Sequence, residues 1–200
     1  MAPESDRASA GGPATDVGDT RRRILEMARE EISCAGWAAA TSGCLAKRAA
    51  VSKALIHYHF QDKDSLLRAV AIACRENVLM RGSARGMRTT HVNPVDGFEE
   101  WLEAELASQD LRIALQLRAS GRGPVVRAAD HVLAAVRSEL QQQVDQVFEI
   151  LGVVPTVPPT SVVDLFMTVT EGAALIPIEP VARLRQMVAT IWFSLLSVSE

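Results

Sequence analysis

The side chains best suited to chemistry in this chain gather between residues 41 and 63. They carry hydroxyl, ammonium, imidazole and phenol groups, and they are Thr41, Ser42, Ser52, Lys53, His57, Tyr58, His59 and Lys63. Such groups donate hydrogen bonds to phosphates and to base edges. The chain has no G-x-S-x-G motif, no H-E-x-x-H motif and no glycine-rich phosphate loop. We therefore expect nucleic-acid recognition here, with no catalytic residue and no enzymatic activity.

Metal and disulfide chemistry is not indicated. His57 and His59 are two residues apart and would point from different faces of a helix, which is a poor geometry for one ion. The three cysteines, Cys34, Cys44 and Cys74, have no C-x-x-C spacing and are odd in number. We expect no metal and no cofactor, and the most economical interpretation is a reduced, cytoplasmic protein.

The charge of the chain is unevenly distributed. From residue 20 to residue 90 there are 13 Lys and Arg against 6 Asp and Glu, whereas residues 91–200 carry 7 against 14. A basic first third suggests contact with a polyanion. A chance distribution of solvated surface charge explains the counts equally well.

The helical repeat dominates the chain after residue 19. Residues 1–19 are rich in Pro, Gly and small polar side chains and are expected to be a flexible leader. Beyond them apolar residues recur at spacings of three and four, which predicts an all-α fold of about nine helices. No apolar run approaches the ~18 residues of a membrane span. The expected helices are 20–35, 42–49, 53–59, one from the Asp62 cap to 81, one opening at Pro94, 110–119, 124–151, one opening at Ser161, and one opening at Pro180.

Two of the expected helices are too short to be stable alone. Residues 42–49 and 53–59, capped by Thr41 and Ser52, make sense as a helix-turn-helix packed on the first helix. In the second of them, Ile56 and Phe60 fall on one side and Ala54 and Tyr58 on the other. The outward side suits a major groove, because Ala54 permits close approach and Leu55 offers an apolar surface to a thymine methyl. A plain helical corner with an exposed Tyr and His is the alternative.

Cations occupy helix starts where the helix dipole disfavours them. Arg21, Arg22 and Arg23 fill the first turn of the first helix, and Lys63 begins the fourth. Three arginines together suggest an external anion such as a nucleic-acid backbone, although a solvated face is the simpler explanation. The hydroxyls of Thr41 and Ser42 add a further candidate phosphate site.

The same segment resembles a known family. The resemblance is carried by residues 45–66, LAKRAAVSKALIHYHFQDKDSL, which are similar to the DNA-binding segment of TetR-type (tetracycline-repressor-like) transcriptional regulators. Its most specific part is Val51-Ser52-Lys53, followed by Tyr58-His59-Phe60 and Lys63, and it covers about residues 20–80. The resemblance implies a DNA-binding domain over 20–66, a helical effector-binding and dimerisation domain over 67–200, and a homodimer.

The resemblance also implies which residues meet DNA. Ser42, Ser52, Lys53, His57, Tyr58 and Lys63 match positions that usually touch DNA, and Ala54 and Leu55 would face bases. Two positions depart from the family pattern: Ala50 stands where the turn usually holds glycine, and His57 replaces the usual tyrosine. A left-handed Ala50 would cost roughly 1–2 kcal/mol.

The C-terminal half carries weaker signals. Two helices, 161–176 and 180–198, are apolar on more than one side and need partners on each side. The family resemblance implies that they form a four-helix interface in the homodimer. Burial inside one subunit is the alternative. Polar or aromatic residues among apolar helices are candidates for effector contacts: Trp101, Gln116, Arg118, His131 and Phe166.

The expected function is a ligand-responsive regulator of transcription. Two copies of the helix 53–59 would enter successive major grooves of a near-palindromic operator, and a small-molecule effector would release the repressor. The alternatives are a dimeric helical protein that binds small molecules, or an enzyme, without DNA recognition.

Overall fold

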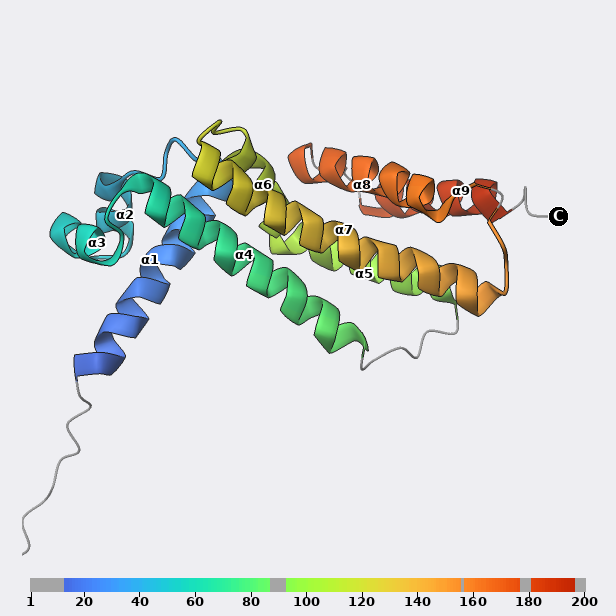
Figure 1. Ribbon diagram of the computed structural model, residues 1–200, viewed down its shortest axis with the longest axis horizontal. Helices are drawn as coiled ribbons and strands as arrows, with labels where there is room; N and C mark the ends of the chain where they lie inside the picture. Colours follow the sequence, from blue (N-terminus) through green and yellow to red (C-terminus); the bar gives the residue numbers. More distant parts are fainter. Residues whose placement is uncertain (1–12, 87–92, 156, 177–180, 197–200) are drawn as a thin grey trace, which may run out of the picture.

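The computed structural model describes residues 13–86, 93–155, 157–176 and 181–196, and over these residues it contains nine helices and no strand. The predicted all-α architecture is confirmed (Figure 1). The helices are α1 Pro13–Ala35, α2 Ser42–Arg48, α3 Lys53–His59, α4 Lys63–Gly86, α5 Pro94–Ser108, α6 Asp110–Arg118, α7 Gly123–Leu151, α8 Pro159–Leu175 and α9 Val181–Leu196.

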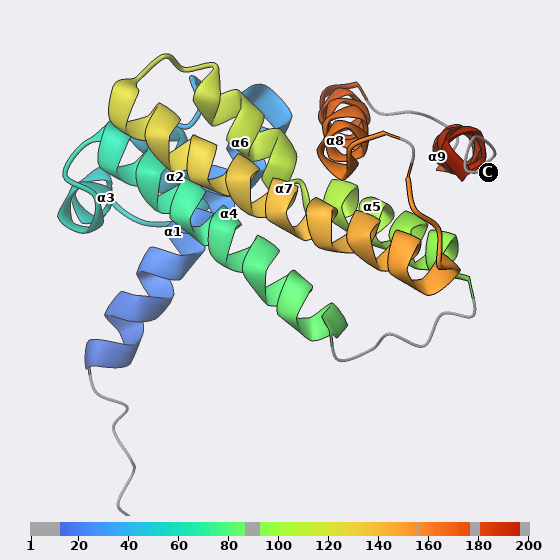
Figure 2. The same ribbon diagram turned by 45° about the vertical axis from the view of Figure 1, so that its right-hand side comes forward.

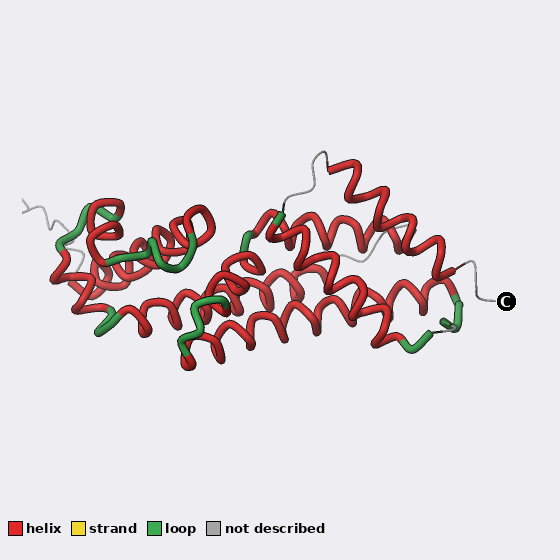
Figure 3. Tube along the Cα trace, turned by 90° about the horizontal axis from the view of Figure 1, so that it is seen from above, coloured by secondary structure: helices red, strands yellow, loops and turns green. Residues whose placement is uncertain are grey.

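The short helices α2 and α3 lie at one end of an elongated molecule (Figures 1 and 3). The long helix α4 leads away from them and packs along α7, which lies between α4 and α8. Figure 2 shows α8 and α9 at the end away from α2 and α3. The arrangement separates a small N-terminal helix group from a larger bundle, with α4 and α6 joining the two.

A continuous apolar core holds α1, α2 and α3 together. The predicted stripe of α1, including Ile24, Ala28 and Ile32, is fully buried. It packs in one cluster with Leu45 of α2 and Ile56 of α3. Burying an aliphatic side chain stabilises by about 1.5–3 kcal/mol, so two helices of seven residues each become stable only through these contacts.

The helix α1 begins earlier than predicted. It starts at Pro13, so residues 13–19 belong to α1, and the predicted leader can extend only over residues 1–12, which lie outside the described residues. Proline is well tolerated at the first position of a helix. Asp19 then accepts a hydrogen bond of 3.1 Å from Arg22, one turn later. Once α1 is anchored by its buried stripe, adding residues to its end avoids the cost of nucleation.

The predicted caps are confirmed at three of four helix starts. Thr41 Oγ1 accepts from the Cys44 amide at 3.2 Å, and Ser52 Oγ accepts from the Leu55 amide at 3.1 Å. Asp62 Oδ1 accepts from the Ser65 amide at 2.6 Å. The start predicted at Ser161 is wrong, because α8 begins at Pro159 with no side-chain cap.

The turn between α2 and α3 holds a left-handed alanine. Ala50 has a φ of +53°, at the position where the family pattern usually has glycine, so the turn keeps the left-handed conformation. The Val51 amide donates to the Ala46 carbonyl at 3.0 Å and the Ala50 amide to the Lys47 carbonyl at 3.4 Å. This pair of hydrogen bonds ends α2 with a left-handed residue, and glycine is the residue that most often occupies this position.

Replacing Ala50 by Gly is expected to raise the free energy of unfolding by about 0.5–1 kcal/mol. The change relieves the steric cost of a left-handed Cβ, and the greater freedom of glycine in the unfolded chain offsets part of the gain. Urea unfolding followed by circular dichroism measures it. The matched control is Ala49→Gly, where φ is −82° and glycine should destabilise; equal effects at both positions would refute the strain at Ala50.

The larger bundle has an aromatic centre. Five buried rings from α5, α7, α8 and α9 contact one another: Phe98, Trp101, Phe148, Phe166 and Trp192. The closest centroids are those of Phe98 and Phe166, 4.6 Å apart. Among the described residues, no helix is both long enough and apolar enough to cross a bilayer.

Candidate nucleic-acid interface

The helix α3 has one buried and one solvent-facing side, as predicted. Ile56 and Phe60 are 2% and 4% exposed and anchor the helix in the core. Lys53, Ala54 and Tyr58 are exposed, and Tyr58 retains 73% of its surface. This exposed surface combines a small residue, a cation and a phenol, and such a surface can approach the base edges in a major groove.

The position of the Lys53 side chain also depends on a residue of α2. A Cβ placed on Gly43 would lie 3.4 Å from Cε of Lys53, so the lysine stem lies alongside this glycine. The small residue in α2 gives the lysine its room. The two short helices therefore present a common surface rather than two separate ones.

The hydroxyls at the helix starts remain free to donate. The oxygens of Thr41 and Ser52 accept from backbone amides within their own helices, and both residues are exposed. A hydroxyl that accepts one bond keeps its hydrogen for another acceptor. Both groups can therefore donate to a phosphate, while Ser42, at the first position of α2, is half-buried.

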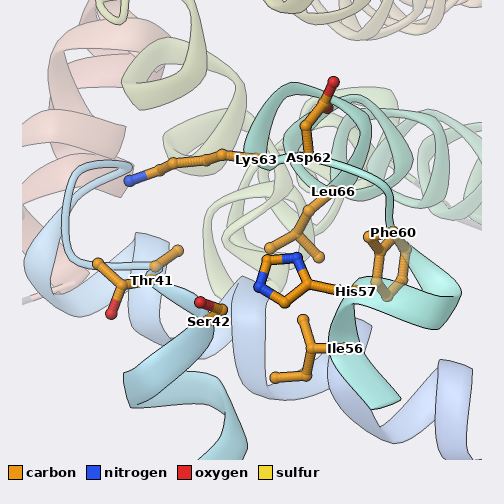
Figure 4. Close-up of a pocket in the computed structure, with 9 residues that line it drawn as sticks. Thr41, Ser42, Ile56, His57, Phe60, Asp62, Lys63 and Leu66 are labelled. Atoms are coloured by element: carbon orange, nitrogen blue, oxygen red, sulfur yellow. The ribbon is translucent and has the colours of Figure 1, made fainter. Parts of the chain in front are cut away.

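A hollow of about 200 Å³ opens where the N-terminal ends of α2 and α4 face α3. Its apolar lining includes Ile56, Phe60 and Leu66. Its polar lining consists of Thr41, Ser42, His57, Asp62 and Lys63. In Figure 4 the ring of His57 lies between Ser42 and Leu66. The structure thus brings Thr41, Ser42, His57 and Lys63, all predicted to meet DNA, to one place.

Lys63 is already engaged within the protein. Its Nζ donates to the Ala38 carbonyl at 2.8 Å and lies 5.1 Å from the centre of the Trp37 ring. Burial lowers the pKa of Lys63, and the neighbouring cation Arg122 lowers it further. These contacts tie the loop before Thr41 to the start of α4, a positioning role that sequence reasoning missed.

His59 does not share the exposed side of α3. It is half-buried, and its Nε2 atom is buried with no hydrogen-bond partner. Its ring and that of Tyr58 form a T-shaped contact with their centroids 5.3 Å apart. Of the other predicted outward residues, Leu55 is half-buried and His57 is exposed. His59 therefore supports the position of the Tyr58 ring more directly than it offers a surface to DNA.

The prediction that Arg21, Arg22 and Arg23 fill the first turn of the first helix is wrong. Because α1 begins at Pro13, these residues lie about two turns inside it, where the helix dipole does not disfavour cations. Two of the three have partners inside the protein. Arg21 lies 5.3 Å from the centre of the Phe60 ring, and Arg22 pairs with Asp19. Arg23 is exposed. Sequence reasoning also missed Arg48, whose guanidinium bridges Glu30 and Glu31 at 2.6 Å and fixes α2 to α1.

The five predicted effector contacts do not come together. Trp101 and Phe166 are both buried in the aromatic centre, where Phe98 contacts each of them. Gln116 is half-buried in α6, and Arg118 forms an exposed ion pair with Asp130 at 3.3 Å. His131 is exposed on α7. Trp101 and Phe166 thus share the aromatic centre, whereas the ion pair of Arg118 reaches the residue that precedes His131 on α7.

A buried ionic network links the N-terminal helix group to the bundle. Asp110 is fully buried and accepts hydrogen bonds of 2.6 Å from both Arg29 of α1 and Arg81 of α4. Arg81 also donates to Glu105 at 2.6 Å. No sequence spacing signals this network, because its members lie on four helices and meet only through the fold.

Comparison with known proteins agrees with this geometry. Residues 24–70 match the family model described as "Bacterial regulatory proteins, tetR family". The chain is 34% identical over 67 residues to the HTH-type transcriptional regulator UidR of Escherichia coli strain K12. That match covers 34% of this chain and 34% of the relative, so it spans about a third of the relative's length.

Solved structures resemble the chain over most of its length. A TetR-family transcriptional regulator from Agrobacterium tumefaciens superposes with a TM-score of 0.75 at 15% identity, covering 90% of this chain and 99% of that one. A transcriptional regulator described as putative, from Saccharomonospora viridis in complex with choline, gives 0.72 at 18% identity, covering 86% and 95%. At these identities the likeness concerns the fold.

Proposed function

We propose that this chain is a ligand-responsive transcriptional repressor that binds a near-palindromic operator. The match of residues 24–70 to the model of the tetR family of bacterial regulatory proteins supports the proposal. The proposal is carried by the outward side of α3, where Lys53, Ala54 and Tyr58 are exposed while Ile56 and Phe60 hold the helix in place. Such a repressor acts in the cytoplasm, where its operator lies.

DNA contact follows from the positions of the polar groups. Ala54, Leu55 and Tyr58 approach base edges, and Lys53 lies beside them. We infer that Thr41, Ser42, Ser52, His57 and Lys63 contact the sugar-phosphate backbone. Four of them, Thr41, Ser42, His57 and Lys63, line the hollow beside α3. His59 is the weakest of the ten proposed contacts, since its ring turns toward Tyr58 and Phe60.

An exposed apolar surface supports a homodimer through α8 and α9. In the single chain, five large apolar side chains of this region lie open to solvent: Leu165, Leu175, Ile176, Met187 and Phe193. Large apolar side chains that are exposed together on neighbouring parts of a helical protein are candidates for an interaction site. A second copy offers the same surface, which is the pattern of a two-fold interface.

Replacing Phe193 by Glu is expected to convert the dimer to a monomer. Phe193 is 76% exposed in the single chain, and a carboxylate buried in the proposed interface would lack a partner. Sedimentation velocity at micromolar concentration gives the mass. The control is Met80→Glu, at an exposed site on α4, which should leave the mass unchanged. A dimer that persists in the Phe193 variant would exclude this surface.

The effector is proposed to bind in the bundle near the aromatic centre. Trp101 and Phe166 lie there, and the Nε1 donor of Trp192 is buried without a hydrogen-bond partner. A ligand with an acceptor atom would satisfy that donor. The fold relative from Saccharomonospora viridis is a precedent for a small ligand, choline, in this architecture. Gln116 and Arg118 of α6 and His131 of α7 lie outside the group of contacting rings and remain proposed contacts of the effector.

The test is a DNA titration at several salt concentrations. A duplex carrying an inverted repeat from the DNA upstream of this chain's gene is compared with a random duplex. We expect preferential binding to the repeat, with a slope of log K against log salt of about −0.9 for each phosphate contacted. Equal, salt-insensitive binding would favour a helical ligand-binding protein without DNA recognition, and turnover of a bound ligand would favour an enzyme.

A further inference from the structure

The turn from α5 into α6 is joined to α1 by three polar contacts. Ser33 Oγ donates to Gln109 Oε1 at 3.0 Å, and Arg29 Nη2 donates to Asp110 Oδ1 at 2.6 Å. Arg112 Nε donates to the backbone carbonyl of Ser33 at 3.0 Å. All three join the last turns of α1 to one short segment of the bundle. The position of α1 relative to the bundle therefore depends strongly on this segment.

Arg112 reaches a second helix end with the same guanidinium. Its Nη1 atom donates to the Ala174 carbonyl at 3.0 Å and to the Leu175 carbonyl at 3.4 Å, at the end of α8. The last carbonyls of a helix have no partner within the helix and carry the negative end of its dipole. A planar cation with donors in a fixed fork can satisfy two such ends together. Arg112 thus connects the C-terminal ends of α1 and α8.

The neighbouring buried network supplies a fixed point. Asp110 accepts from Arg29 and Arg81, and Arg81 also donates to Glu105, so four charged groups from α1, α4, α5 and α6 meet inside the protein. Their formal charges cancel. Ion pairs of this kind add little stability over a well-packed apolar core. Their fixed hydrogen-bond geometry does restrict how the four helices can be placed relative to one another.

We propose that Arg112 is a positioning residue that couples the end of α8 to the angle of α1, with the Asp110 network as the pivot. The proposal rests on the proposed function, because it assigns the path by which the bundle controls the DNA-reading helices. A shift at the end of α8 moves the guanidinium, and the guanidinium moves the Ser33 carbonyl. Because α1 packs directly on α2, the orientation of α3 follows.

The first test measures the angle between the two parts within one chain. Spin labels are placed at Gln61 and Gln142, both exposed, in a background with Cys34 and Cys44 replaced by Ser. Labelled chains are diluted in unlabelled protein so that only intrachain distances appear. We expect Arg112→Met to broaden the distance distribution about twofold or to shift its maximum, as expected for a released joint. An unchanged distribution would overturn the proposal.

A matched control and a second variant keep the result interpretable. Arg127 lies on α7 of the same bundle and is exposed, so Arg127→Met should leave the distribution unchanged. If Arg127→Met has the same effect, the loss of any arginine from the bundle explains the result and the proposal fails. If Arg112→Met does not fold, Arg112→Lys is measured instead, because a compact ammonium lacks the planar fork of the guanidinium.

The second test measures the affinity of the parent and the Arg112→Met variant for operators with different half-site spacing. Inserting one base pair at the centre of the operator rotates and separates the half-sites, and we expect the parent protein to lose about tenfold in affinity. The Arg112→Met variant should lose less than about threefold, because its α3 helices can adjust. Equal losses would contradict the proposal. If the parent does not prefer operator to random duplex, the proposed function fails, and the intrachain distances alone decide the role of Arg112.

Discussion

Replacing Lys53 and Tyr58 together by alanine is expected to weaken operator binding on the order of 100-fold. Each side chain lies on the exposed side of α3 and contributes at most minor contacts to the core. A good contact to a base edge is worth about 1–3 kcal/mol, so two lost contacts account for the effect. Fluorescence anisotropy with labelled operator at constant salt measures the loss of affinity. The same titration repeated at several salt concentrations should give nearly the same slope of log K against log salt for the parent and the variant.

Folding must remain intact for this result to be informative. Since both side chains are exposed, the free energy of unfolding should change by less than about 0.5 kcal/mol. The control replaces Arg75 and Met80 of α4 by alanine, again removing one cation and one large exposed side chain. The control should bind operator like the parent. Full affinity in the Lys53 and Tyr58 double variant would remove α3 from the DNA interface.

Replacing Asp110 by Ala is expected to lower the free energy of unfolding by about 3–5 kcal/mol. The carboxylate is fully buried and is shared by Arg29 and Arg81, whose guanidinium groups would lose a partner while partly buried. Burial is the main cause of the raised pKa of the neighbouring Cys74 thiol, and it persists when Asp110 is removed. We therefore expect this thiol to remain protonated and not to replace the lost charge. Urea unfolding provides the measurement.

An exposed ion pair between α6 and α7 provides the comparison. Asp130 pairs with Arg118 at 3.3 Å, with about half of each side chain open to solvent. Asp130→Ala should therefore change the free energy of unfolding by less than about 1 kcal/mol. If Asp110→Ala is no more destabilising than this control, the buried network does not hold α1 on the bundle.

Local sequence rules account well for the N-terminal helices. The caps at Thr41 and Ser52 and the inward side of α3 follow from residue type and spacing. Each depends on groups within a few residues of one another, whose relative positions are set by the helical repeat. The helix-turn-helix and its outward side are therefore encoded locally in the chain.

Helix ends are less predictable where packing extends them. The first helix begins at Pro13 instead of Thr20, because a helix already anchored by Ile24 and Ala28 can continue into a weak sequence. At α8 the expected cap is not used. Asp164 lies inside the helix and pairs with Arg137 of α7 instead, a partner far away in the sequence.

The sequence by itself determined which residues face outward on α3, because that depends only on the angle between successive helical positions. Only the tertiary structure decided which charges meet. Lys63 lies against Trp37, Asp110 is shared by Arg29 and Arg81, and Arg112 joins the ends of two helices. These partners come from separate helices, so their encounter depends on how the helices pack, and no local periodicity encodes that packing.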